Sequence, residues 1–249
     1  MAYRNLFIGL LIAALPAFAA EPSRLTPEAS ALIAPALAAF KTIDADYAAL
    51  PPTTDVAQQL IRMGRRDQDT RIAYSKIDFA KLTGEQRTLA FDAVYAEIDR
   101  RDAEHQKALV DLLPAEGWFA KSKYGAEAAE AAWLILQHAV RLKPELLRTV
   151  KPAMDGMLAA HEVDRPSYAR LDDRLAMMDG RFQTYGTQMV CHMSRWVAYP
   201  IGDRNAVDQR RKEMEITETV TEMLTAMASR TCPSEWTGKL PPGAKLGEP

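Results

Sequence analysis

Apolar residues recur three or four positions apart along most of the chain, the spacing that places them on one face of a helix. Thr26-Pro27 is typical of a helix start, Pro51-Pro52 ends the first helix, and residues 83–86 resemble a capping box. The pattern predicts helices over residues 27–50, from 54 to at least 72, and over 83–114, 126–142, 144–160, 166–180 and 217–230.

The helical spacing stops between Phe182 and Ile201, where the run from Met189 to Tyr199 predicts a loop with a short hairpin. We therefore predict an all-α fold of six or seven helices with a small β-hairpin or loop insertion near residues 182–201. No repeat or composition break divides the helices, so residues 21–230 are predicted to form one domain, followed by a C-terminal tail over 231–249.

Residues 1–20 have the pattern of a secretory signal peptide. Arg4 precedes an apolar run that Pro16 breaks, and the pattern Ala17-Phe18-Ala19, typical of a cleavage site, follows. The run is too short to cross a bilayer of roughly 30 Å as a helix. We expect cleavage after Ala19 or Ala20, a periplasmic or secreted location, and no stable membrane insertion after cleavage.

Export changes how the two cysteines are interpreted, because disulfides persist in oxidising compartments. Cys191 and Cys232 are the only cysteines of the chain. We expect them to form one disulfide that ties the C-terminal tail to the second half of the domain. Closing a loop of about 40 residues stabilises a fold by roughly 4 kcal/mol.

Composition and charge narrow the classes of function. The chain has 249 residues, 48% of them hydrophobic, with 31 Lys and Arg against 33 Asp and Glu. This is an ordinary globular composition, and a net charge of -2 argues against nucleic acid as a partner.

Standard catalytic motifs are absent from the sequence, which has no nucleophile elbow, Walker loop, zinc-protease motif or dinucleotide fingerprint. The four histidines lie far apart, so we assign no metal ligands and no cofactor, although a mixed metal site stays open. Asp102 and His105 stand three apart on a predicted helix and could offer two ligands. The charged run around them, however, favours a solvated helix face.

Four polar clusters stand at positions where a helical protein usually has apolar residues or residues with no particular chemical role. They are Arg66-Asp67-Gln68 with Arg71, then Gln137-His138, then Asp172-Asp173-Arg174, and finally Gln183 to Gln188.

The order of these clusters forms a recognisable pattern. It consists of Asp67-Gln68-x-x-Arg71, Trp133 with Gln137-His138, Tyr168-Ala169 leading to Asp173-Arg174, Gly180-x-x-Gln183-x-Tyr185-Gly186-Thr187-Gln188, and Arg210-Arg211 after Pro200-Ile201 and Asp203. The pattern resembles a bacterial family known only as a domain of unknown function, over roughly residues 60–224. The resemblance implies no established activity, and the stretch from Val190 to Ser194 departs from it.

The loop at Gly186 has two interpretations. Glycine permits positive φ, so Tyr185 and Thr187 can point in different directions while Gln183 and Gln188 present amides to a ligand. Alternatively, these polar groups only satisfy helix ends and backbone.

Arg174 directly follows Asp173 and cannot pair with it along the helix face. We therefore expect it to meet a carboxylate elsewhere, and Asp67 is the candidate. For Arg174, a role in a structural salt bridge is favoured over a role in binding a substrate.

Two functions of different classes fit these residues. We favour a ligand-binding or scaffold module that takes a small molecule or a cell-envelope component. The alternative is a small periplasmic hydrolase-like enzyme in which His138, held by Asp67 or Asp173, acts as general base. Both require the polar residues to converge on one centre. The residues assigned to that centre are His138, Asp67 and Asp173 for catalysis, and Arg66, Gln68, Arg71, Gln137, Arg174, Gln183, Tyr185, Thr187 and Gln188 for binding.

Overall fold

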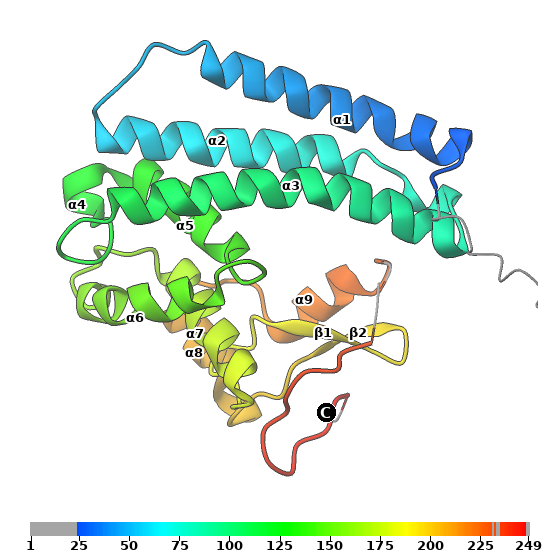
Figure 1. Ribbon diagram of the computed structural model, residues 1–249. Coiled ribbons are helices and arrows are strands. Elements are labelled where there is room, and N and C mark those ends of the chain that lie inside the picture. The colour runs from blue at the N-terminus through cyan, green and yellow to red at the C-terminus, as the bar shows by residue number, and fades with distance from the viewer. Residues whose placement is uncertain (1–23, 231, 233–234, 248–249) are drawn as a thin grey trace, which may run out of the picture.

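Three long helices form one side of the molecule. A computed structural model describes residues 24–230, 232 and 235–247 of the chain. The long helices α1 (Pro27–Ala48), α2 (Val56–Ser75) and α3 (Gly84–Leu112) lie side by side along the top of Figure 1, with the 3-10 helix η1 (Phe79–Lys81) before α3.

Four further helices pack beneath this layer. They are α4 (Lys121–Tyr124), α5 (Ala126–His138), α6 (Pro144–Leu158) and α7 (Arg165–Asp179). Helix α5 runs against α2, where Gly64 faces Ala131 with no room for a larger side chain. Its many alanines allow this close approach, because small side chains let two helix backbones come near each other.

A hairpin and two short helices complete the fold. Strands β1 (Met189–His192) and β2 (Arg195–Ala198) pair antiparallel, and they precede the 3-10 helix η2 (Arg204–Ala206), α8 (Val207–Glu213) and α9 (Val220–Met227). Helix α9 lies beside the hairpin (Figure 1). Cys191 of β1 is bonded to Cys232, and their Cα atoms lie 5.6 Å apart.

Two apolar clusters hold these elements together. The larger one joins α2, α3, α5, α6 and α7 around buried side chains such as Trp118, Phe119 and Leu136. The smaller one joins α1 to the end of α2 and the first half of α3, around Phe40 and Val94. The polar residues of interest lie on the elements gathered by the larger cluster.

The predicted all-α fold with one small β insertion is confirmed, and so is the pairing of Cys191 with Cys232. The helix predicted over 126–142 ends at His138 and continues as a turn, and the last helix spans only Val220–Met227. Helix α8 was not expected, because its seven residues are too short to show a period.

The predicted capping box at residues 83–86 is wrong, since Thr83 makes no side-chain cap. Gln86 instead accepts from the backbone of Thr26 and donates to that of Arg24, which ties α3 to the start of α1. The predicted signal peptide lies outside the described residues. Among the helices described, none combines the length and the apolar character that a membrane crossing needs.

Candidate functional site

The candidate site residues fall into two groups on either side of the C-terminal end of α5. Gln137 and His138 are the last two residues of that helix, and neighbouring helical residues point about 100° apart. His138 contacts Asp67 of α2, whereas Gln137 lines a cavity with Arg174 of α7. The structure therefore divides the expected single centre into two polar groups that share one helix end.

The first group, here called the acid–histidine cluster, consists of Asp67, Arg71, Asp102 and His138. Oδ1 of Asp67 lies 3.1 Å from Nδ1 of His138 and 3.4 Å from Nη2 of Arg71. The same Nη2 atom lies 2.6 and 2.8 Å from the two carboxylate oxygens of Asp102. Asp67 and Asp102 are buried, but the His138 side chain is 25% exposed. A buried pair of acids thus meets an imidazole that solvent can reach.

Charge in this cluster is unevenly compensated. Burial acts to raise the pKa of Asp67, but His138 and Arg71 outweigh it and hold that pKa below its ordinary value. For Asp102, burial prevails and raises the pKa although Arg71 opposes the rise. Asp67 and Asp102 share the single positive charge of Arg71, which cannot balance the negative charges of two ionised carboxylates.

Asp67 also orients the imidazole of His138. A carboxylate facing Nδ1 favours the tautomer that carries its proton there, which leaves Nε2 as a proton acceptor. The second oxygen of Asp67 accepts from the amide of Gln68 at 2.8 Å. This is the geometry of a general base held by an acid, and Asp67 rather than Asp173 holds it.

The second group, here called the arginine cavity, is a space of about 100 Å³ between α5, α6, α7 and the loop before β1. This is room for several water molecules or for one small oxyanion. It is lined by Trp133, Gln137, Leu147, Arg170, Arg174, Thr187 and Gln188.

Arg174 is the unusual member of this cavity. Its Nε donates to Oε1 of Gln188, and no carboxylate of the described residues pairs with it. Burial lowers the pKa of Arg174, with no negative charge acting against the shift. The expected salt bridge from Arg174 to Asp67 is absent, because Asp67 is engaged by His138, Arg71 and Gln68 on the other side of α5.

Asp173, the neighbour of Arg174, anchors the loop instead of facing the cavity. Its carboxylate accepts from the backbone N–H groups of Thr184, Tyr185 and Thr187 at 2.7, 3.0 and 2.8 Å, and from the Thr187 hydroxyl at 2.9 Å. Burial raises the pKa of Asp173, and these donors oppose the rise. Among the described residues, the hydrogen bonds of the Asp173 carboxylate are thus all made with the loop that it shapes.

The rest of the loop is fixed in the same way. The amide of Gln183 donates to the backbone oxygens of Gln188 and Tyr199 and accepts from the backbone N–H of Gln188. Buried Arg211 donates to the backbone oxygens of Tyr185 and Gly186. Gly186 has φ +64, and a Cβ there would meet Val220 at 2.8 Å. These hydrogen bonds within the loop place Gln188 beside Arg174.

With both groups described, the chain can be compared with known proteins. A family described as "Family of unknown function (DUF6624)" matches residues 54–227. The chain belongs to this family. The predicted membership in a family of this kind is thereby confirmed. No curated protein and no solved structure matches the chain significantly.

The part matched by the DUF6624 family begins just before α2 and ends with α9, so it contains both polar groups. Helix α1 and the tail lie outside it. The family description names no activity, and the function has to be argued from the two groups themselves.

Arg66 belongs to neither group. It contacts Asp44 of α1 at 2.6 Å and Glu104 of α3 at 3.1 Å. Nη1 of Arg66 also lies 3.5 Å from Nε2 of His105. The expectation of a solvated face around Asp102 and His105 is wrong, since both are buried, at 7% and 3% exposure.

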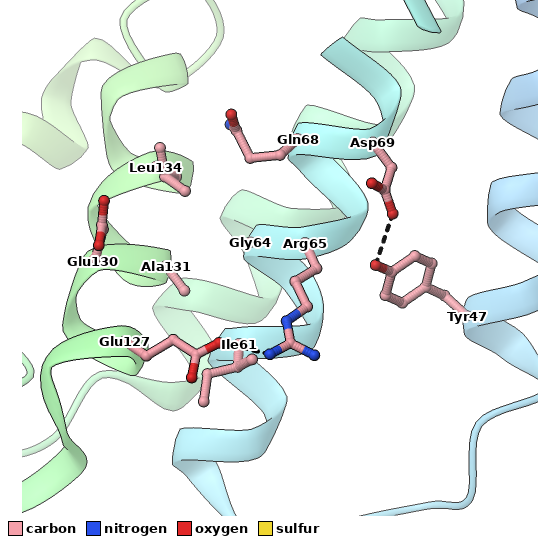
Figure 2. A pocket seen from close by; sticks show the side chains of 10 residues that line it. All are labelled: Tyr47, Ile61, Gly64, Arg65, Gln68, Asp69, Glu127, Glu130, Ala131 and Leu134. Atoms are coloured by element: carbon pink, nitrogen blue, oxygen red, sulfur yellow. Dashed lines mark hydrogen bonds and ion pairs between the residues drawn. The ribbon is translucent and has the colours of Figure 1, made fainter. Parts of the chain in front are cut away.

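Another hollow, of about 260 Å³, lies between α2, α5 and the end of α1 (Figure 2). Arg65 pairs with Glu127 at 2.7 Å, and the Tyr47 hydroxyl donates to Asp69 at 2.9 Å. Only Gln68 of the predicted site residues lines this hollow. The one cationic side chain among its described lining residues, Arg65, is thus already paired, so the hollow offers less to an anionic ligand than the arginine cavity.

Sequence reasoning missed two residues of these groups. Arg170 lines the arginine cavity, and its spacing of four from Arg174 places both on one face of α7, which the sequence does reveal. Asp102 joins the acid–histidine cluster from α3. The sequence offers Asp102 only as a possible ligand beside His105, and its partners on α2 and α5 lie outside any local pattern.

Proposed function

We propose that the protein is an exported binding module that holds a carboxylate or phosphate group in the arginine cavity. The observation that carries the proposal is the guanidinium of Arg174, which is largely withdrawn from water without a carboxylate partner in the described part of the chain. A buried charge is costly unless it is paired. An anionic ligand would supply the missing partner.

The other residues that line the cavity suit an anion. Arg170 lies one helical turn before Arg174 and has no carboxylate partner among the described residues, and none of the described lining residues is acidic. The Gln137 amide has no protein partner in the described chain and can donate to a ligand. Two guanidinium groups with a neutral amide are typical donors for a planar carboxylate or a phosphate.

Export is supported by the pattern of residues 1–20 and by the bonded cysteine pair. A periplasmic or secreted binding module meets small metabolites and cell-envelope components, both of which carry carboxylates and phosphates. The ligand therefore belongs to one of these two sources.

The test is a titration of the isotopically labelled protein with inorganic phosphate and, separately, with acetate, observed by NMR. We expect both probes to shift the side-chain amide resonances of Gln137 and Gln188 and the Nε resonance of Arg174. In the Arg174→Gln variant these shifts should disappear.

Arg181→Gln is the matched control, because Arg181 follows the end of α7 but is exposed and paired with Asp179 at 3.1 Å. The control should respond like the wild type. Shifts that survive in Arg174→Gln, or an absence of shifts in the wild type at tens of millimolar probe, would refute the anion site.

A second candidate function is favoured by one observation, the contact of 3.1 Å between Asp67 and Nδ1 of His138. In the hydrolase-like alternative, Nε2 of His138 takes a proton from water or from a nucleophile. The substrate would then lie at the solvent-reachable side of the ring. Turnover of p-nitrophenyl acetate or phosphate that is lost in His138→Asn and kept in His192→Asn would support this alternative.

A further inference from the structure

The acid–histidine cluster has the composition of a metal site, with a set of ligands that the sequence did not bring together. We propose that Asp67, Asp102 and His138 bind one divalent transition-metal ion. This site is separate from the arginine cavity, and it would add a cation-dependent function to a protein whose proposed ligand is an anion.

The ligand atoms are already close together. One carboxylate oxygen from each acid and one imidazole nitrogen lie within 4.8 Å of one another. They come from α2, α3 and α5, three helices held in place by the larger apolar cluster. A nitrogen with two oxygens is a donor set that Zn²⁺ accepts, and three protein ligands leave a further position for water.

The contacts of Arg71 show where a cation would sit. An arginine usually meets a carboxylate with two nitrogens side by side. Here the single atom Nη2 makes all three contacts, with one oxygen of Asp67 and both oxygens of Asp102. The buried Nε of Arg71 has no partner in the described part of the chain. Nη2 thus acts as a point charge between the two acids, the role that a metal ion would take.

The charge balance of the cluster also favours a cation. Two buried carboxylates, those of Asp67 and Asp102, face the single guanidinium of Arg71. Arg71 is 22% exposed, so its side chain has a route toward solvent when an ion binds. A divalent ion would then replace its point charge and use His138 as the third ligand.

The first test needs no variant. After dialysis against EDTA, the purified protein is titrated with ZnCl₂, and the histidine ring nitrogens are observed by ¹⁵N NMR. We expect one equivalent of Zn²⁺ to shift the ring resonances of His138 and to leave those of His192 in place. MgCl₂ should produce no such shift, because Mg²⁺ prefers oxygen ligands.

The second test compares variants by isothermal titration calorimetry, with circular dichroism to verify that each is folded. His138→Ala and Asp102→Asn should weaken Zn²⁺ binding at least tenfold. His192→Ala is the matched control, since His192 is also an imidazole near a carboxylate, at 3.8 Å from Glu235. Its affinity should equal that of the wild type.

Arg71→Met is expected to change the Zn²⁺ affinity in the opposite direction. Removing the competing guanidinium should tighten Zn²⁺ binding severalfold, whereas a purely structural ion pair would yield no binding in any variant. Absence of Zn²⁺ binding by the wild type, or binding that shifts His192 and survives His138→Ala, would overturn the proposal. Neither result bears on phosphate binding at Arg174, so the two proposals can fail separately.

Discussion

Asp173 is the residue on which the shape of the polar loop depends most directly. Asparagine has one acceptor oxygen where aspartate has two, and its amide would present a donor to the backbone N–H groups of the loop. We expect Asp173→Asn to lower the free energy of unfolding by about 3 kcal/mol or more, because buried donors lose a charged acceptor. Urea denaturation followed by circular dichroism measures this loss.

Asp172→Asn is the control for that change. Asp172 stands beside Asp173, but it is partly exposed and its ion pair with Lys151 is 3.3 Å long. Its loss should stay below about 1 kcal/mol. Equal losses in the two variants would show that the loop does not depend on the Asp173 carboxylate.

His105 should make the stability depend on pH. Burial and then Arg66 lower its pKa from 6.5 to about 4, so the unfolded chain binds a proton at a higher pH than the folded one does. Stability from this group is therefore complete above pH 6.5 and is lost as the pH falls toward 4. Between pH 7 and 4.5 the loss amounts to roughly 2 kcal/mol.

The comparison that isolates His105 uses urea denaturation of the wild type and of His105→Gln at several pH values. The variant should lose less stability than the wild type over that range. His192→Gln removes a partly exposed imidazole and should keep the wild-type slope. If the His105→Gln slope equals the wild-type slope, His105 is not the group responsible.

At the scale of elements, the contact between α2 and α5 leaves no room for an added side chain. A Cβ added at Gly64 would lie 2.7 Å from the Cβ of Ala131 and 2.9 Å from its Cα. We expect Gly64→Ala to destabilise the protein by about 2 kcal/mol, because two helix backbones would have to separate. Thermal unfolding measures the effect, and Ala131→Gly should restore part of the loss in the double variant.

Gly156→Ala in α6 is the matched control, because a Cβ there meets nothing within 4 Å. Alanine is the better helix former, so this variant should gain up to about 1 kcal/mol. Loss of stability in both variants would point to a general intolerance of the substitution and not to the α2–α5 contact. Since α2 and α5 carry Asp67 and His138, Gly64→Ala should also weaken the contact between them.

At the scale of the whole molecule, the disulfide joins the tail to the hairpin. The tail makes further contacts there: Glu235 accepts from the backbone N–H groups of Met193 and Ser194, and the Tyr199 hydroxyl donates to the backbone of Lys239. Reduction, or the double change Cys191→Ser and Cys232→Ser, should lower stability by roughly 4 kcal/mol. In urea this corresponds to a midpoint lower by about 1 to 2 M.

The double variant provides its own control. A reducing agent should lower the urea midpoint of the wild type and leave that of the double variant unchanged. If the wild type keeps its midpoint in the reducing agent while mass spectrometry shows free thiols, the disulfide contributes little to the fold.

Much of the fold could be predicted because its signals are local. Thr26 caps α1 through the N–H of Ala29, three residues away, and the hairpin follows from a run of residues that lacks helical spacing. Helix ends were less accurate. Whether α5 ends at His138 or four residues later depends on what packs against it, and the sequence does not contain that information in one place.

The candidate site residues, like the helices, were predicted only in part from the sequence. The sequence identified Asp67, His138 and Arg174 as polar residues in unusual positions, but it paired Arg174 with the wrong residue. The structure pairs Asp67 with His138 across a separation of 71 residues and leaves Arg174 with Gln188. No spacing rule reaches across such a separation.

The sequence alone therefore determined the helical class, the hairpin, the cysteine pair and the types of side chain available for chemistry. Each depends on neighbours within a few residues or on the mere presence of a residue type. Only the tertiary structure decided that α3 turns Asp102 inward and that the end of α5 separates the acid–histidine cluster from the arginine cavity. Those outcomes depend on the packing of helices distant in the chain, where burial fixes which charges meet.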